Sequence, residues 1–272
     1  IQGDAGYNRI PFFIFKGKEV SMKLREVYEY LDSIFPFSLQ AEWDNSGIQV
    51  GSLNSTISGI AVTLDVDKSL LEFCKRENIN LIISHHPLIF KRIGQIVMED
   101  DKTEVVYKAI SYGINVISAH TNVDIADGGL ADYLAELLGL QVMEPLSKEG
   151  FGRLCLTEEV SLEELLGKLK ERLRLEEIRY VEGCSHRIRK VAICPGSGCD
   201  LIGEAIRKGA DAYITGDMKY HHAKSAEDRI HLIDVGHYGS EIIFVDLIYN
   251  RLKSMDLRII KYYIKNPIKT WR

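Results

Sequence analysis

The stretch Ile114-Asn115-Val116-Ile117-Ser118-Ala119-His120-Thr121-Asn122-Val123-Asp124 joins a short apolar run to a polar segment. Such a run, rich in β-branched residues, is typical of a buried strand. A matching stretch in the second half, His237-Tyr238-Gly239-Ser240-Glu241, follows the strand-type run 231–235, and each stretch places a histidine four residues before a carboxylate. A third run, 81–84, ends directly in His85-His86. Histidine or acidic residues thus follow the ends of three predicted strands.

Around these strands the chain alternates between strand and helix patterns. An amphipathic helix is predicted at 22–34, where apolar residues recur at helical spacing. Strands are expected at 60–64, 81–84, 114–118, 153–156, 178–181, 190–194, 212–215, 231–235 and 257–264. Helices are expected at 68–76, 103–112, 130–138, 162–173, 200–208 and 240–252. Short apolar strands that alternate with helices predict an α/β fold with mixed, mostly parallel sheets flanked by helices.

The two halves also match each other in order. Residues 60–62 correspond to 191–193, and 81–84 correspond to 212–215 at the same separation. We interpret this as an internal duplication that gives two related α/β domains; the competing interpretation is chance likeness between α/β units.

The expected domain boundaries follow from this duplication. The domains should span 22–143 and 153–272, with a linker at 144–152 that contains Pro145, Gly150 and Gly152. An alternative for the extreme C-terminus is that it packs against the first domain. Residues 1–21 are interpreted as an appended or tag-derived segment, with a native extra strand as the alternative.

Composition excludes some classes of protein. With 272 residues and 46% hydrophobic residues, the chain is ordinary for a globular protein. No segment approaches the roughly 20 apolar residues of a membrane span, so no membrane partner is expected. The formal net charge of -5 makes nucleic acid an unlikely partner. Five cysteines, odd in number and irregularly spaced, favour a reduced, cytoplasmic setting.

The polar residues at the strand ends are the candidate site. In open α/β sheets, ligands bind beyond the carboxyl ends of strands, and imidazole and carboxylate are the usual ligands of catalytic transition metals. The residues at such ends are His85, His86, His120, Asp124, His237 and Glu241. Neighbouring imidazoles in a loop can bind two different metals, and Asp124 or Glu241 can bridge them. The competing interpretation is surface histidines and acids that favour helix N-termini.

Other residues have candidate roles as well. His221 and His222 follow the strand 212–215, as His85 and His86 follow 81–84. They are candidate ligands, general acids or phosphate contacts, with a polar helix start as the alternative. We take His120 and His221 as the catalytic candidates. Asp44, Asn45 and Asn122 are candidate substrate contacts, although Asn also favours turns.

At these motifs the sequence resembles the Nif-three-like dinuclear-metal proteins, which are also called GTP cyclohydrolase I type 2 homologues. The matching stretches, in family order, are Glu42-Trp43-Asp44-Asn45-Ser46-Gly47-Ile48-Gln49-Val50-Gly51, Ser84-His85-His86-Pro87-Leu88, residues 118–124, Thr215-Gly216-Asp217-Met218-Lys219-Tyr220-His221 and Gly236-His237-Tyr238-Gly239-Ser240-Glu241. The resemblance covers the chain from Met22 nearly to its end and is to the short form, without an inserted domain. Residues 1–21 have no counterpart, and His222 stands where many relatives have an acid.

The resemblance implies a specific site and assembly. The implied metal ligands are His85, His86, Asp124, His237 and Glu241, with Glu241 as a bridging carboxylate. It also implies two divalent metal ions and a homohexameric ring whose metal sites face an internal cavity. Zinc, iron, manganese and nickel all suit such ligands.

We therefore expect a dinuclear metal-dependent hydrolase that acts on a small nucleotide-like or phosphorylated substrate. The alternative is a non-catalytic metal-binding hexamer with a regulatory or interaction role. A ring that binds nucleic acid is the third hypothesis, and the net charge disfavours it.

Overall fold

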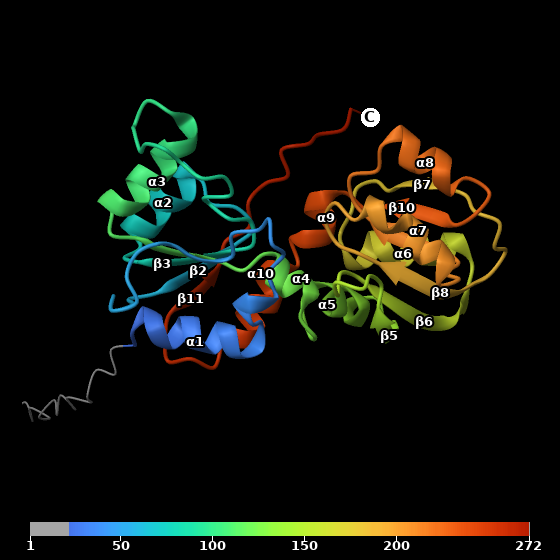
Figure 1. The fold of residues 1–272 in the computed structure, drawn as a ribbon, viewed down its shortest axis with the longest axis horizontal. Coiled ribbons are helices and arrows are strands. Elements are labelled where there is room, and N and C mark those ends of the chain that lie inside the picture. The colour runs from blue at the N-terminus through green and yellow to red at the C-terminus, as the bar shows by residue number, and fades with distance from the viewer. Residues whose placement is uncertain (1–21, 272) are drawn as a thin grey trace, which may run out of the picture.

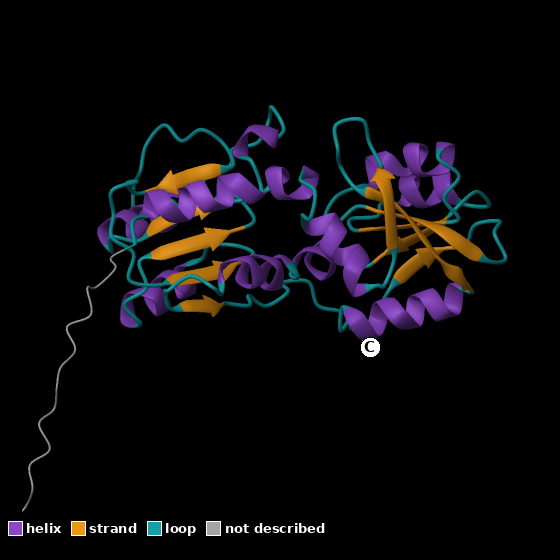
Figure 2. Cartoon of the chain, turned by 90° about the horizontal axis from the view of Figure 1, so that it is seen from below, coloured by secondary structure: helices purple, strands orange, loops and turns teal. Residues whose placement is uncertain are grey.

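The computed structural model describes residues 22–271. The segment 1–21, interpreted above as appended, lies outside the described residues. The chain forms two β-sheets flanked by helices, one in each lobe of the molecule (Figure 1). Seen from below, helices lie on both sides of each sheet (Figure 2). The predicted α/β class with mixed sheets flanked by helices is therefore confirmed; the first sheet is mostly parallel, whereas three of the five strand pairings in the second are antiparallel.

The first sheet has the strand order β1-β4-β3-β2-β11. Its strands are β1 (Gly47–Val50), β2 (Ile60–Thr63), β3 (Leu81–Ser84), β4 (Asn115–Ser118) and β11 (Ile259–Lys261). Strands β2, β3, β4 and β11 are parallel, and β1 runs antiparallel to β4. The register pairs Thr63 with Ser84 and Ser84 with Ser118, so the three central strands end in line at one edge.

The second sheet has the order β5-β6-β8-β9-β10-β7. Its strands are β5 (Gln141–Pro145), β6 (Arg153–Val160), β7 (Arg179–Val181), β8 (Ile188–Ile193), β9 (Ala212–Thr215) and β10 (His231–Asp234). Strands β8, β9 and β10 are parallel, as β2, β3 and β4 are in the first sheet. Thr215 pairs with Asp234, so these strands also end in line.

The helices cover the two sheets. They are α1 (Leu24–Ile34), α2 (Lys68–Arg76), α3 (Asp101–Ser111), α4 (Thr121–Ile125), α5 (Leu130–Leu137), α6 (Leu162–Arg172), α7 (Ile202–Arg207), α8 (Tyr220–Ala226), α9 (His237–Glu241) and α10 (Phe244–Leu252), with short 3-10 turns at Phe37–Leu39 and Cys199–Leu201. Local signals explain several starts: the Asp67 carboxylate accepts a hydrogen bond from the Leu70 N–H, and Ser161 forms a capping box with Glu164. None of the helices in 22–271 is long and apolar enough to cross a bilayer.

One difference from the sequence pattern matters for the site. The single helix expected at 240–252 is two helices, α9 and α10, and α9 already begins at His237. Gly236 precedes it with a φ of 77°, a left-handed conformation that glycine adopts without strain. His237 and Glu241 therefore lie one turn apart on the same helix and can face the same point.

The two halves of the chain interlock. The C-terminal helix α10 packs against β2, and β11 extends the first sheet (Figure 1). At the other side, β5 pairs with β6, so residues 141–145 belong to the second sheet although 144–152 was expected as a linker. One hydrophobic core contains residues of both halves, including Ile83 and Ile214. The two sheets are therefore held in a fixed relation.

Buried Arg153 adds a polar connection between the halves. Its side chain, only 2% exposed, donates to both Asp132 oxygens at 2.7 and 3.0 Å. It also donates to the carbonyls of Ala126, Gly150 and Gly152, each at 2.9 Å. This one guanidinium ties the segment around α4 and α5 to the start of β6.

We predict that Arg153→Met lowers the free energy of unfolding by about 3–5 kcal/mol, because the Asp132 carboxylate, which is only 19% exposed, loses its charged partner. Urea denaturation monitored by circular dichroism measures the change. The control Arg187→Met removes an arginine whose side chain is 58% exposed and should change stability by about 0.5 kcal/mol or less. Equal stability of both variants would contradict the role given to Arg153.

Candidate metal centre

Five side chains from both halves meet at the strand ends. His85 and His86 directly follow β3, Asp124 lies in α4 after β4, and His237 and Glu241 form the two ends of α9 after β10. The buried Glu241 carboxylate lies at their centre. These are the residues that the family resemblance implies as metal ligands, and the structure brings all five together.

The two oxygens of Glu241 face different neighbours. Its Oε2 lies 3.0 Å from His86 Nε2 and 2.9 Å from His237 Nε2. Its Oε1 lies 3.7 Å from His85 Nε2, and that nitrogen lies 3.8 Å from Asp124 Oδ1. The carboxylate therefore divides the ligands into two sets, one with His86 and His237 and the other with His85 and Asp124.

The second nitrogen of each of these three histidines has its own partner. His85 Nδ1 lies 3.0 Å from the Ala119 carbonyl oxygen. His86 Nδ1 lies 2.7 Å from Asp65 Oδ1. His237 Nδ1 lies 2.8 Å from Asp217 Oδ2. Such contacts fix the ring orientation and present Nε2 to a metal.

Sequence reasoning missed Asp65 and Asp217. Both lie two residues after the last residue of a strand, β2 for Asp65 and β9 for Asp217. They therefore stand at the same sheet edges as the ligands. That position was the available signal, since an acid beside a ligand histidine is a common orienting partner.

The charges in the cluster indicate a place for cations. Burial would raise the pKa of Glu241, but the hydrogen bond with His237 and the charge of the nearby His85 ring hold it well below its usual range. Burial opposes protonation of His86, yet Asp65 and Glu241 raise its pKa to about 10. The bond to Glu241 raises the pKa of His237 to about 9 against the effect of burial. In the metal-free protein, His86 and His237 thus carry protons at positions that suit a metal ion.

Two buried atoms in the cluster have no hydrogen-bond partner among the described residues. These are His85 Nε2 and Asp124 Oδ1. A buried polar atom without a hydrogen bond costs free energy, and both atoms belong to ligand types that bind divalent metals. In addition, the ligand atoms of His86, His237 and Glu241 all lie within 4.8 Å of one another. The residues present therefore fit metal ions.

The loop after β8, in the second half of the chain, packs closely against the cluster. A Cβ on Gly196 in this loop would stand 2.0 Å from Glu241 Oε1, and the φ of Gly196 is 67°. Any other residue at 196 would therefore be strained and would displace the carboxylate.

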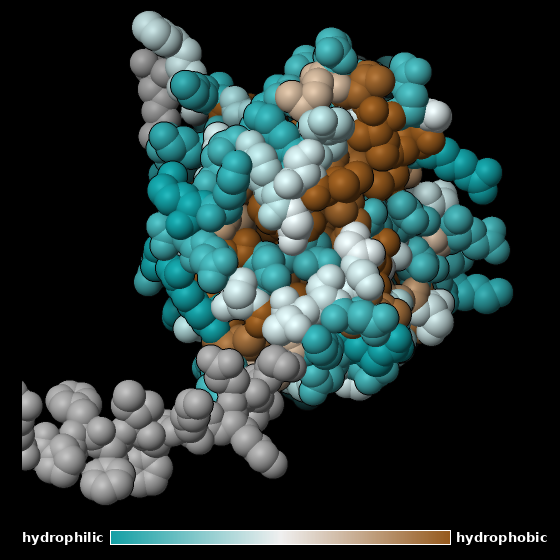
Figure 3. Space-filling model, turned by 90° about the vertical axis from the view of Figure 1, so that its left-hand side faces the viewer, coloured by the Kyte–Doolittle hydropathy of each residue, from teal (hydrophilic) through white to brown (hydrophobic). Residues whose placement is uncertain are grey.

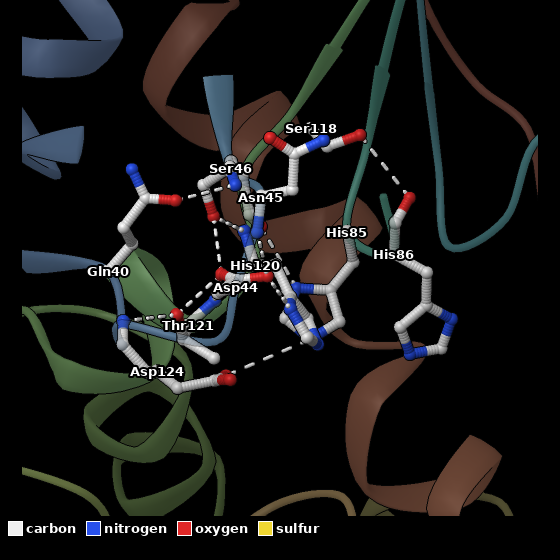
Figure 4. Close-up of polar contacts among 12 residues, drawn as sticks. Gln40, Asp44, Asn45, Ser46, His85, His86, Ser118, His120, Thr121 and Asp124 are labelled. Atoms are coloured by element: carbon white, nitrogen blue, oxygen red, sulfur yellow. Dashed lines mark hydrogen bonds and ion pairs between the residues drawn. The ribbon is translucent and has the colours of Figure 1, made fainter. Parts of the chain in front are cut away.

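Asp44 and His120 form a second polar group beside the cluster (Figure 4). Asp44 Oδ1 lies 2.8 Å from His120 Nδ1, and its Oδ2 accepts hydrogen bonds from Thr121 and Ser46. Burial would raise the pKa of Asp44, but the bonds with His120 and Thr121 hold it well below its usual range. A ring nitrogen of His120 also lies within 4.8 Å of those of His85 and His86. Asp44 therefore positions His120 at the edge of the cluster.

Asn45, Asn122 and His221 make other contacts. Asn45 Nδ2 donates to the Ile89 carbonyl at 2.6 Å and so joins two loops. Asn122 is fully buried and donates to the Phe35 carbonyl at 2.8 Å, which makes it a packing residue of α4. His221 is exposed on α8, with its ring 5.5 Å from that of Tyr220. His222 accepts a hydrogen bond from the Lys219 N–H at the start of α8.

A cavity opens beside the cluster. Its volume is about 270 Å³. Its lining includes Trp43, His120, Asp124, Phe151, His237 and Glu241. Members of both ligand sets therefore border a space that a small molecule can enter.

Comparison with known proteins confirms the family resemblance. A family model described as Duf34/NIF3 (NGG1p interacting factor 3) matches residues 22–267. The GTP cyclohydrolase 1 type 2 homolog of Campylobacter jejuni is 37% identical, over 91% of this chain and 99% of the relative. The GTP cyclohydrolase 1 type 2 of Helicobacter pylori is 34% identical, over 90% and 98%. Staphylococcus aureus protein SA1388 shares the fold, with a TM-score of 0.83 at 24% identity over 93% and 100% of the two chains. This chain belongs to the Duf34/NIF3 family.

Proposed function

We propose that this protein binds two divalent metal ions and hydrolyses a small nucleotide-like or phosphorylated substrate. The observation that carries the proposal is the division of ligands by Glu241. Its Oε2 faces His86 and His237 at 3.0 and 2.9 Å, and its Oε1 faces His85 at 3.7 Å. A carboxylate with a separate histidine set at each oxygen suits two ions rather than one.

The chain's own residues would hold the ions and the reacting groups. Glu241 stays ionised because its pKa is held low, and Asp65 and Asp217 keep Nε2 of their histidines directed inward. Two bound divalent ions would supply Lewis acidity and lower the pKa of water, which is the chemistry of hydrolysis. The ligand types suit zinc, iron, manganese or nickel.

His120 is the candidate for proton transfer. If Nδ1 of its ring donates to Asp44 at 2.8 Å, Nε2 is left as the basic nitrogen. His120 lines the cavity next to Asp124 and Glu241. It is therefore placed to take a proton from a nucleophile or to give one to a leaving group.

Two further observations support an enzyme. A purely structural metal site is closed to solvent, whereas a catalytic one keeps an open side; here the cavity reaches Asp124, His237 and Glu241. The relatives named GTP cyclohydrolase 1 type 2 and its homologue support a nucleotide as the substrate class. The open side disfavours the non-catalytic alternative.

We further propose that the chain assembles into a homo-oligomer, most simply the hexameric ring that the family resemblance implies. One face of the first half carries an apolar area among hydrophilic residues (Figure 3). The exposed apolar side chains of this half include Ile93, Ile96, Met98 and Ile110, which are between 37% and 54% exposed. Large exposed apolar patches mark contact surfaces.

We predict that Glu241→Gln loses at least one metal ion, because the amide keeps the shape but offers only one good ligand oxygen and no charge. Elemental analysis after metal loading and gel filtration should find about two equivalents in the parent protein and one or fewer in the variant. Glu227→Gln, on the surface at the end of α8, is the control and should keep both ions. Two tightly held ions in Glu241→Gln would contradict the bridging role.

We predict that metal binding at pH 7 releases protons. In the metal-free protein the pKa of His86 is about 10 and that of His237 about 9, so both rings carry a proton that a metal must displace. Calorimetry in two buffers of different ionisation enthalpy measures the release, which should be about one proton per histidine. A heat independent of the buffer would count against these assignments.

The same pKa values predict the pH dependence of the metal-free fold. Both folded values lie above the unfolded value of roughly 6.5, so the stabilisation is complete below that pH and is lost as pH rises through about 9 and about 10. Chelator-treated protein should therefore unfold at lower urea concentration at pH 9.5 than at pH 7. The double variant His86→Ala/His237→Ala should lose most of this difference.

We predict that light scattering of the purified chain gives a mass near six times 30.8 kDa. A single species at the monomer mass at micromolar concentration would disprove the assembly and leave the metal site untouched.

A further inference from the structure

Two exposed aromatic rings lie next to each other near the metal cluster, and one of them, Trp43, lines the cavity there. Trp43 is 61% exposed and Phe90 is 46% exposed. Their ring centroids lie 6.1 Å apart with the planes inclined at 66°. Trp43 lines the cavity, and its ring also lies 6.1 Å from that of His120. A large aromatic surface therefore faces open space within reach of the candidate catalytic group.

Hydrogen bonds of neighbouring residues join the two segments that carry these rings. Asn45 donates to the Ile89 carbonyl at 2.6 Å, and Gln49 Oε1 accepts the Ile89 N–H at 3.1 Å. These bonds tie the loop that carries Trp43 to the loop that carries Phe90. Asp44, next to Trp43, is fixed by His120. The rings are thus exposed on a rigid support, which lowers the ordering cost when a ligand binds.

The size and the walls of the cavity indicate what would bind. A volume of about 270 Å³ is at the lower end of the roughly 300–1,000 Å³ found for small-molecule pockets, so it suits one ring system rather than a long chain. Phe151 adds a further aromatic wall, and the exposed Ser197 offers a hydroxyl. An aromatic face next to a few polar groups is a common arrangement for binding a flat heterocycle.

We propose that Trp43, supported by Phe90, is a stacking platform that selects substrates with a planar heteroaromatic ring. The ring lies on Trp43, and its polar substituents point toward His120 and the metal ligands. This inference rests on the proposed function, because it names the substrate feature that the same site recognises. It also gives Asn45 a role: Asn45 positions the two loops instead of touching the substrate.

The sequence contains only two tryptophans, Trp43 and Trp271, which makes a direct test possible. Trp271 is fully exposed near the C-terminus, so Trp271→Phe leaves Trp43 as the single reporter. Zinc-loaded Trp271→Phe protein is titrated with guanosine monophosphate, guanosine, and ribose 5-phosphate, and the tryptophan fluorescence is recorded. The first two probes should quench it saturably. Ribose 5-phosphate, which has no ring base, should not.

Variants of Trp43 in the full chain measure the contribution of stacking. Trp43→Leu keeps an apolar side chain without a flat face and should weaken binding of guanosine monophosphate by about 5- to 150-fold. Trp43→Phe should restore it to within a few-fold of the parent. Tyr220→Leu, at an exposed aromatic on α8, should leave the affinity unchanged. Calorimetry gives the affinities, and elemental analysis confirms equal metal content.

Several results would overturn the platform. These are absence of binding by both ring probes at millimolar concentration, equal binding of ribose 5-phosphate, or full affinity in Trp43→Leu. A lower oligomeric mass of Trp43→Leu with unchanged affinity would assign the rings to a subunit contact instead. These experiments measure binding and not turnover. Ring-selective binding without any hydrolysis would therefore contradict the proposed hydrolase function and still support the stacking role of Trp43.

Discussion

The arrangement of the candidate metal centre depends on one carboxylate, which lies between ligands from both halves of the chain. Glu241 is buried, remains ionised and lies against three histidines. An ionised carboxylate in such a place is costly unless cations compensate it. Among the chain's own residues, imidazolium groups do so, while His85 Nε2 and Asp124 Oδ1 have no hydrogen-bond partner among the described residues. Divalent ions would compensate the carboxylate and satisfy these atoms together.

That arrangement requires both halves of the chain. His85 and His86 come from the end of β3 in the first sheet, whereas His237 and Glu241 come from α9 after β10 in the second. The common hydrophobic core, the return of α10 and β11 to the first sheet and the buried Arg153 hold the halves together. Packing far from the site therefore sets the distances within it. A change in the way the halves meet would alter the distances from Glu241 to His85 and His86, whereas His237, on the same helix, would move with Glu241.

Part of the fold and of the site was predictable from sequence. Apolar runs that alternate with helical patterns indicated the strands, and the histidines and acids at the ends of three runs indicated the site, although acids are also favoured at helix N-termini. The break between α9 and α10 was not, because 242 and 243 are both isoleucine and continue the helical pattern. The burial of Asn122 against the Phe35 carbonyl depends on a contact 87 residues away. Asp65 and Asp217 were missed because an acid after a strand is also common in ordinary turns.

Anomalous diffraction from crystals of the metal-loaded protein would show directly whether Glu241 joins two metal ions. We expect two anomalous peaks per chain, about 3.5–4 Å apart. One should lie near His85 and Asp124, the other near His86 and His237, with Glu241 between them. A single peak at full occupancy, or two peaks with Glu241 bound to only one, would rule out the bridging role of Glu241.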